Sequence, residues 1–136
     1  MPQINQHSIL LGGIGGDSHS VGLVILRQAF SMNGYRVLYL GTQTKLEEFF
    51  YWSPLCNAVM ISNMDGHAKY YLQQFPELVR KYGPQKSTWY LGGNLAVGDA
   101  VGYEQHFLEI GFNRVWVNFV DVETVLATLK RDLYNV

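Results

Sequence analysis

The sequence contains only one cysteine and has no long apolar run. Cys56 stands alone among 136 residues, which excludes a disulfide framework and a cluster of thiolate metal ligands. We interpret it as a small core residue in a reducing compartment. No apolar run approaches the length that spans a bilayer, and the polar segment 1–7 lacks the apolar stretch of a signal peptide. We therefore expect a cytoplasmic protein with no membrane partner.

Basic residues are also few, and they are scattered along the chain. The formal net charge is −1, and no basic stripe suggests a nucleic-acid partner. Charged residues make up 15% and apolar residues 48% of the chain, a balance typical of a globular protein. No repeat, linker or low-complexity segment divides the sequence. We therefore expect a single domain over residues 1–136.

Apolar runs alternate with amphipathic stretches along the whole chain. This alternation predicts an α/β fold with a doubly wound parallel sheet that is covered by helices on both faces. Thr44 could cap the second helix. The predicted strands are 8–12, 36–40, 58–63, 88–91 and 114–117, and the predicted helices are 21–33, 45–52, 70–82, 103–110 and 122–134.

Small and polar residues follow three of the predicted strands. In parallel α/β sheets, ligands bind at the carboxyl ends of the strands, where the winding reverses. Three loops that are distant in sequence are therefore expected to line one crevice. They contain Asp17 and His19 after the first strand, Ser62, Asn63 and Met64 at the end of the third, and Gly92, Gly93 and Asn94 after the fourth.

The pair Asp17 and His19 is the most informative of these features. A carboxylate two residues before a histidine can accept a hydrogen bond from one ring nitrogen, which leaves the other nitrogen neutral and available to a metal. The preceding glycine-rich loop, 12–16, would let a large flat group approach the backbone. The pattern indicates a histidine that holds a metal, which could be part of a bulky cofactor.

Two other functions are disfavoured by residues that are missing. A dinucleotide fingerprint needs a third glycine where Ser18 stands, and an acidic residue at the end of the second strand, which instead reads Leu40-Gly41-Thr42. A serine esterase with its nucleophile in Gly16-Asp17-Ser18 needs a late Asp-x-x-His. The last histidine, His106, has tyrosine three residues before it.

A dinuclear metallophosphoesterase remains a weaker alternative. Such enzymes also place Asp-x-His after a first strand, and they take further ligands from later loops. Asp65, His67 and Asn94 are candidates for those ligands. However, the segment Gly93-Asn94-Leu95 lacks the histidine that would follow the asparagine. His67 has no glycine loop before it, so we interpret it as a polar loop residue.

The three loop motifs, in this order, resemble those of a cobalamin-binding family. That family carries Asp-x-His-x-x-Gly, then Ser-x-Leu, then Gly-Gly. Here the motifs read Asp17-Ser18-His19-Ser20-Val21-Gly22, then Ser62-Asn63-Met64, then Gly92-Gly93. The chain is particularly similar to the small (sigma) subunit of glutamate mutase (methylaspartate mutase), from Ser8 to about Leu133. Met64 replaces the usual leucine, which is a volume-conserving change.

The resemblance implies a flavodoxin-like five-stranded fold and a cofactor bound base-off. His19 would replace the dimethylbenzimidazole of the cofactor as the lower axial ligand of cobalt, and Asp17 would accept a hydrogen bond from His19. The detached nucleotide tail would enter a slot between the first helix and the sheet. The implied cofactor-binding residues are Gly16, Asp17, Ser18, His19, Ser20, Gly22, Ser62, Asn63, Met64, Gly92, Gly93, Asn94, Leu95 and Ala96.

Within the slot, the resemblance implies distinct roles for these residues. Gly22, Gly92 and Gly93 would give room, Ser62 would hydrogen-bond the buried base, and Met64 would pack on it. After the fifth strand, the usual Pro-Gly-Thr-like turn is replaced by Val-Asn-Phe-Val at 117–120. This segment is expected to border the slot or a partner.

The resemblance further implies an isomerase that uses adenosylcobalamin for a radical rearrangement of glutamate to 3-methylaspartate. The chain is too short to enclose a substrate as well, so catalytic substrate residues are expected on a larger barrel-type subunit, in a heterotetramer. A non-catalytic cobalamin carrier, sensor or methyl-transfer corrinoid protein is the alternative. Methyl-transfer members usually carry a helical cap, whereas only seven residues precede Ser8.

Overall fold

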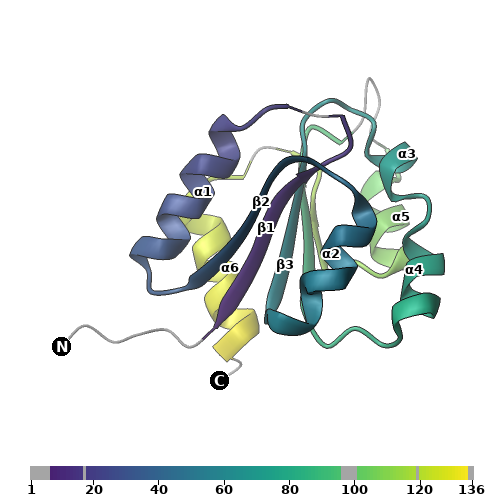
Figure 1. The fold of residues 1–136 in the computed structure, drawn as a ribbon. Coiled ribbons are helices and arrows are strands. Elements are labelled where there is room, and N and C mark those ends of the chain that lie inside the picture. The colour runs from purple at the N-terminus through teal and green to yellow at the C-terminus, as the bar shows by residue number, and fades with distance from the viewer. Residues whose placement is uncertain (1–6, 17, 96–100, 119, 135–136) are drawn as a thin grey trace.

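The structure is a computed structural model that describes residues 7–16, 18–95, 101–118 and 120–134 (Figure 1). Within these ranges, five strands form one parallel sheet in the order β2-β1-β3-β4-β5. The winding reverses between β1 and β3, as the sequence predicts for a doubly wound flavodoxin-like fold. The strands are β1 (Ser8–Ile14), β2 (Arg36–Thr44), β3 (Ala58–Asn63), β4 (Thr88–Gly93) and β5 (Arg114–Trp116).

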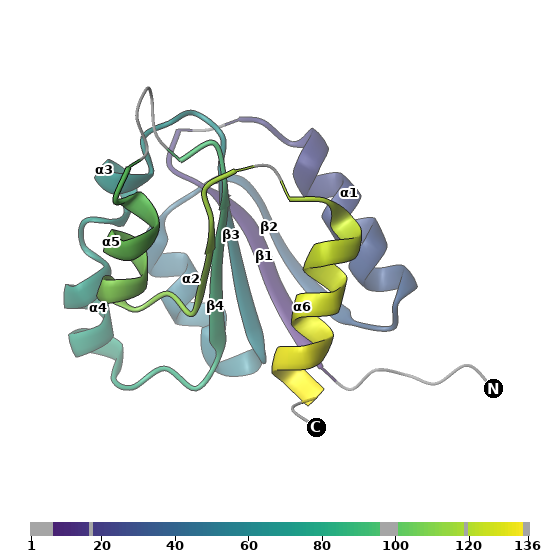
Figure 2. The same ribbon diagram turned by 180° about the vertical axis from the view of Figure 1, so that it is seen from behind.

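Helices cover both faces of the sheet (Figures 1 and 2). The helices α1 (Val21–Met32) and α6 (Val122–Tyr134) lie on one face. The other face carries α2 (Leu46–Trp52), the short 3₁₀ helix η1 (Ser53–Leu55), α3 (Ala68–Leu72), α4 (Phe75–Tyr82) and α5 (Tyr103–Ile110). None of the helices in the described ranges is long and apolar enough to cross a membrane.

A hydrophobic core lies on each face of the sheet, and side-chain alternation along β1 explains how one strand contributes to both. Ile9 and Leu11 pack with Leu23 of α1 and Leu129 of α6, whereas Leu10 belongs to the core beneath α2–α5. Successive side chains of a strand point to opposite faces, and a parallel sheet buried on both sides therefore reads as a continuous apolar run.

Three strands extend further toward the carboxyl edge of the sheet than the sequence predicts. β1 continues to Ile14, because Gly12 and Gly13 pair with residues of β3 and belong to the strand. The prediction of a loop over 12–16 was therefore wrong for its first half, and only Gly15 and Gly16 form the turn. β2 and β4 likewise run on to Thr44 and Gly93, while β5 ends at Trp116.

The predicted helix 70–82 is two helices, α3 and α4. Pro76 lacks an N–H and would clash with the carbonyl four residues earlier, so one continuous helix cannot form there. Thr44 is not a helix cap: it ends β2, its hydroxyl donates to the Gly41 carbonyl, and Lys45 holds the N-cap position of α2. The helices α5 and α6 have the predicted bounds, and α1 ends one residue early.

A charged cluster ties α6 to β4 and β5. Arg114 Nη2 donates to Asp132 Oδ1 at 2.7 Å, Arg114 Nε donates to Asp132 Oδ2 at 3.0 Å, and the Tyr90 hydroxyl donates to Oδ2 at 2.8 Å. The hydrogen bonds from Arg114 hold the pKa of Asp132 below its usual range. Burial raises the pKa of Tyr90, and the hydrogen bond that its hydroxyl donates to Asp132 raises that pKa further.

We expect Asp132→Asn to lower the free energy of unfolding by about 1–2 kcal/mol near neutral pH, since Arg114 loses a charged, mostly buried partner. A depressed carboxyl pKa contributes stability above the unfolded value of about 3.9 and loses it as pH falls through the folded value. The gap between the two proteins should therefore close in acid. Urea unfolding of both proteins at neutral pH and below pH ~3.9 measures this difference in stability. Glu123→Gln on α6 is the control. A stability difference that persists in acid would contradict the role given to the Asp132 carboxylate.

Candidate functional site

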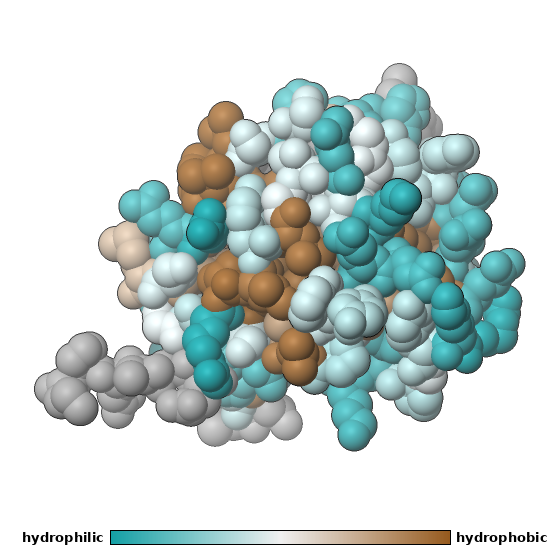
Figure 3. Space-filling model, in the orientation of Figure 1, coloured by the Kyte–Doolittle hydropathy of each residue, from teal (hydrophilic) through white to brown (hydrophobic). Residues whose placement is uncertain are grey.

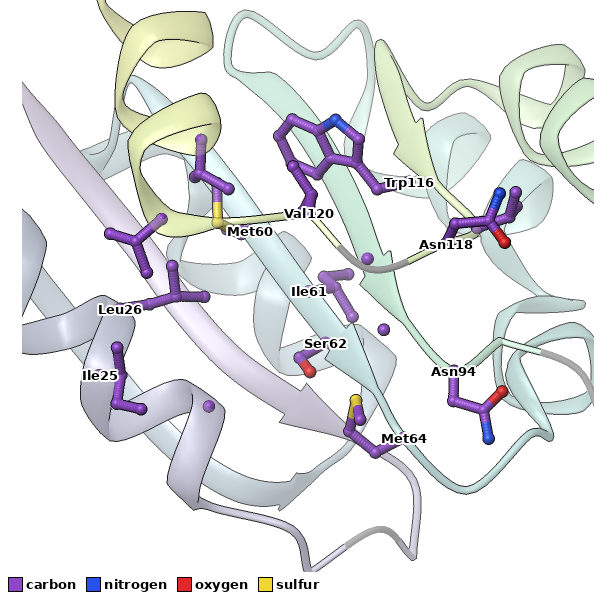
Figure 4. A pocket seen from close by; sticks show the side chains of 16 residues that line it. Ile25, Leu26, Met60, Ile61, Ser62, Met64, Asn94, Trp116, Asn118 and Val120 are labelled. Atoms are coloured by element: carbon purple, nitrogen blue, oxygen red, sulfur yellow. The ribbon is translucent and has the colours of Figure 1, made fainter.

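A cavity of about 540 Å³ lies between α1, the sheet and the segment that leads from β5 into α6 (Figure 4). It opens at the carboxyl ends of the strands, beside the switch point between β1 and β3. The side chains that surround it are mostly apolar. They include Ile25 and Leu26 of α1, Met60 and Ile61 of β3, Trp116 of β5, and Val122 and Val125 of α6.

Missing side chains create part of this space. A Cβ placed on Gly22 of α1 would have no heavy atom within 4 Å, so that position faces open room. Gly92 of β4 lies on the opposite wall, where a Cβ would contact the Trp116 ring at 3.5 Å. Gly93 has φ +122°, and a Cβ there would lie 2.3 Å from the Asn63 carbonyl. Glycine at position 93 is therefore required by the backbone itself.

Polar groups are few along the cavity. Ser62 at the end of β3 and the amides of Asn94 and Asn118 line it, together with Met64, whose side chain is 42% exposed (Figure 4). Val117 and Val120 also line the cavity, so the segment that replaces the Pro-Gly-Thr-like turn borders it; Phe119 is outside the described residues.

Six of the described residues that were predicted to bind the cofactor do not line the cavity. Four of them, Gly16, Ser18, His19 and Ser20, precede α1, and the other two are Asn63 and Leu95. Asn63 is fully buried and absent from the cavity wall, as strand alternation after Ser62 requires. Within the described part of the chain, neither polar atom of its side chain has a hydrogen-bond partner. Leu95 packs into the core beneath α2–α5. Asp17 and Ala96 lie outside the described residues.

Residues 18–20 connect the glycine turn to α1, and all three are exposed. Ser20 occupies the N-cap position of α1, with no capping hydrogen bond from its side chain. His19 stands three residues before Gly22, so it precedes the helix that forms one wall of the cavity.

Three residues that the sequence analysis missed hold the turn before this segment. The Gly15 N–H donates to the Thr44 carbonyl at 3.0 Å, and Gln43 Nε2 donates to the Gly16 carbonyl at 3.3 Å. From the other side, the Tyr71 ring occupies the space where a Cβ of Gly15 would lie. No local sequence signal marks these residues, because only the fold brings them to the turn.

The first two turns of α1 also carry exposed apolar side chains. Val21 is 74%, Val24 50% and Ile25 49% exposed. Figure 3 shows hydrophobic surface gathered over this part of α1. Apolar surface gathered beside a cavity is typical of a site that another group or protein covers.

The residues considered for a dinuclear metal site have other roles. Asp65 Oδ1 accepts a hydrogen bond from the His67 backbone N–H at 3.0 Å, and Oδ2 accepts one from the Tyr71 hydroxyl at 3.2 Å. Across the described ranges, no three histidine, cysteine or acidic side chains gather closely enough to hold a metal ion. The described geometry therefore offers nothing in support of the phosphoesterase alternative.

The sheet order defines a flavodoxin-like domain with a cavity at its switch point. The fold is similar to a cobalamin-binding protein from Desulfitobacterium hafniense (TM-score 0.69, 18% identity, 93% of this chain and 58% of that one). It is also similar to the methanol:cobalamin methyltransferase complex MtaBC from Methanosarcina barkeri (TM-score 0.75, 15% identity, 100% and 49%). The chain thus spans about half the length of these two solved chains.

Curated relatives identify the family. The chain is 37% identical to glutamate mutase sigma subunit 2 of Haloarcula marismortui over 130 residues, which is 93% of this chain and 87% of that protein. It is 32% identical to the glutamate mutase sigma subunit of Yersinia enterocolitica over 133 residues, 95% and 90% of the two chains. No family model matches the chain. The chain belongs to the glutamate mutase sigma subunit family, as its motifs predict.

Proposed function

We propose that this chain is the cobalamin-binding subunit of an adenosylcobalamin-dependent glutamate mutase, with His19 as the lower axial ligand of cobalt. The observation that carries the proposal is the apolar cavity beneath α1. Its first lining residue, Gly22, stands three residues after His19 in the sequence. Family membership supports the same function, since the relatives are glutamate mutase sigma subunits.

The cavity residues fit the nucleotide tail of cobalamin. A flat heterocycle needs an apolar slot, and Met60, Ile25 and Val125 offer one. Gly22 leaves open room where any other residue would place a side chain. The Ser62 hydroxyl can donate to a nitrogen of the buried base, which would otherwise cost about 1–3 kcal/mol of unmet hydrogen bonding. Gly92 and Gly93 keep the floor of the slot at backbone level.

His19 suits the role of metal ligand because it is exposed and stands three residues before Gly22, the first residue of the cavity wall. A neutral imidazole binds metal through one nitrogen while the other donates to an acceptor that fixes the ring. The Asp-x-His spacing in the sequence supports the Asp17 carboxylate as that acceptor. The neighbouring Gly16, Ser18 and Ser20 add little bulk, which suits the close approach of a corrin ring to the backbone.

When bound, adenosylcobalamin would supply the radical chemistry of the rearrangement. This chain provides the ligand below the metal and the slot for the tail. Substrate residues then belong to a larger, barrel-type catalytic subunit in a heterotetramer, and the designation of the relatives as sigma subunits supports the existence of a partner. The exposed apolar side chains of Val21, Val24 and Ile25 suit a surface that becomes covered.

Reconstitution tests this function. The purified chain is mixed with adenosylcobalamin, glutamate and glutamate mutase catalytic subunits from the organisms of the relatives named above, and 3-methylaspartate is measured by NMR. We expect product only when both subunits and the cofactor are present. Cobalamin binding without product in any combination would instead favour the non-catalytic carrier, sensor or methyl-transfer alternative.

Replacing Ser62 with alanine tests its proposed contact with the base. We expect the dissociation constant for cobalamin to rise about tenfold, because one buried nitrogen loses a donor worth about 1.4 kcal/mol. Thermal unfolding should change little, since Ser62 lies on the cavity wall. Ser31→Ala, on the exposed end of α1, is the control. Unchanged affinity in the Ser62 variant would remove this residue from the site.

A further inference from the structure

We infer that Tyr71 of α3 is a positioning residue that fixes the segment bearing His19. The inference rests on the proposed role of His19 as a cobalt ligand. Tyr71 is distant from that segment in sequence and lies on the opposite side of the sheet from the cavity-forming α1. It belongs to none of the motifs that identify the family, so its effect must come through the fold.

The Tyr71 ring lies directly against the turn that precedes this segment. A Cβ built on Gly15 would come within 2.4 Å of three atoms of that ring, so glycine is the only residue that leaves room for it. Gly15 has φ +76°, which also favours glycine. A Cβ on Gly16 would lie 3.3 Å from the Tyr71 hydroxyl. The ring therefore supports both residues of the turn.

The position of the ring is itself fixed by Asp65. The Tyr71 hydroxyl donates to Asp65 Oδ2 at 3.2 Å, and Asp65 Oδ1 is held by the His67 backbone N–H at 3.0 Å. The His67 carbonyl in turn accepts the Tyr71 N–H at 3.2 Å. This closed set of bonds makes the end of β3 and the start of α3 a rigid support for the ring.

The end of β2 holds the turn from its other side. Thr44 accepts the Gly15 N–H, and Gln43 donates to the Gly16 carbonyl. Gln43 has φ +57°, a conformation that is unfavourable for a residue with a side chain and persists only where its surroundings require it. The turn is thus held between Tyr71 and β2, which limits the positions open to Ser18 and His19.

A fixed turn lowers the cost of ligation, because His19 need not be ordered when it meets the metal. Loss of the Tyr71 ring should therefore weaken the step that uses His19 and spare the slot beneath α1. The free dimethylbenzimidazole nucleotide probes the slot alone, since it carries no cobalt. Intact cobalamin probes the slot and the histidine together.

The experiment compares Tyr71→Phe, Tyr71→Ala and the control Tyr70→Phe, which alters the adjacent, 68% exposed tyrosine. We expect Tyr71→Ala to weaken cobalamin binding about tenfold, the size typical for residues that orient a metal ligand. Tyr71→Phe, which keeps the ring and loses the bond to Asp65, should fall between Tyr71→Ala and the wild type. Affinity for the free nucleotide should be unchanged in all three variants.

Hydrogen exchange of the cofactor-free protein gives a second readout. Amide protection at Gly15 and Gly16 should fall in Tyr71→Ala and stay at the wild-type level in Tyr70→Phe. Wild-type cobalamin affinity in Tyr71→Ala, or an equal loss for cobalamin and the free nucleotide, would overturn the inference. If wild-type protein binds neither probe, the proposed function fails, whereas unaltered exchange in Tyr71→Ala refutes the positioning role by itself.

Discussion

His19→Ala is expected to raise the dissociation constant for cobalamin by more than about 100-fold. Residues that merely orient a metal ligand already contribute about 10- to 100-fold to affinity or activity, so loss of the ligand itself should exceed that range. The fold should be unaffected, because His19 is exposed and lies before the first residue of α1. Equilibrium dialysis with cobalamin measures the affinity, and thermal unfolding checks the fold.

His67→Ala is the matched control for this variant. His67 is also exposed and also follows an aspartate by two residues, so both motifs read Asp-x-His. Asp65, however, accepts hydrogen bonds from the His67 backbone and the Tyr71 hydroxyl. We expect wild-type cobalamin affinity in His67→Ala. Equal losses in the two variants would contradict the assignment of His19 as the single ligand.

Gly22→Leu is expected to lower cobalamin affinity about 10- to 100-fold while leaving the protein at least as stable as the wild type. The added side chain would enter the open space that a Cβ at position 22 faces, and overfilling a site costs about 1–3 kcal/mol. A helical glycine is less favourable than other residues by about 0.5–1 kcal/mol, so its replacement should not destabilise α1. Loss of binding without loss of stability would identify the cavity as the ligand site.

Gln28→Leu places the same side chain on an exposed position of α1 away from the cavity. It should bind cobalamin as the wild type does. Gly22→Ala should give an intermediate loss, since its methyl group occupies only the edge of the space. Undiminished affinity in Gly22→Leu would show that the nucleotide tail lies elsewhere.

Patterns along single segments were sufficient to predict the architecture. The strand Ala58–Asn63 and the helix Val122–Tyr134 have the predicted bounds, because the apolar residues of each follow the period of that structure. Local patterns failed where a neighbouring strand decides the structure. Gly13 looks like a loop residue, yet pairing with β3 makes it part of the strand. The break at Pro76 follows from a known steric rule, which the apolar spacing obscured.

In the candidate site, too, local motifs predict some features and only three-dimensional packing determines the others. Motifs placed Gly22, Ser62, Met64, Gly92 and Gly93 correctly on one cavity, since parallel strands bring their carboxyl ends together. They could not separate Asn63 from its neighbours, because the side chains of adjacent strand residues point to opposite faces. Nor could they reveal Tyr71 or Gln43, whose contacts with the glycine turn depend on three-dimensional packing alone.

The most direct test of the central claim is an electron paramagnetic resonance spectrum of cob(II)alamin bound to protein labelled throughout with the heavy nitrogen isotope. The unpaired electron couples to the nitrogen below the cobalt, and the two isotopes differ in nuclear spin. We predict that labelling converts the triplet splitting into a doublet, and that His19→Ala abolishes the doublet. A triplet that persists in the labelled protein would mean that cobalt keeps its own base, and would contradict ligation by His19.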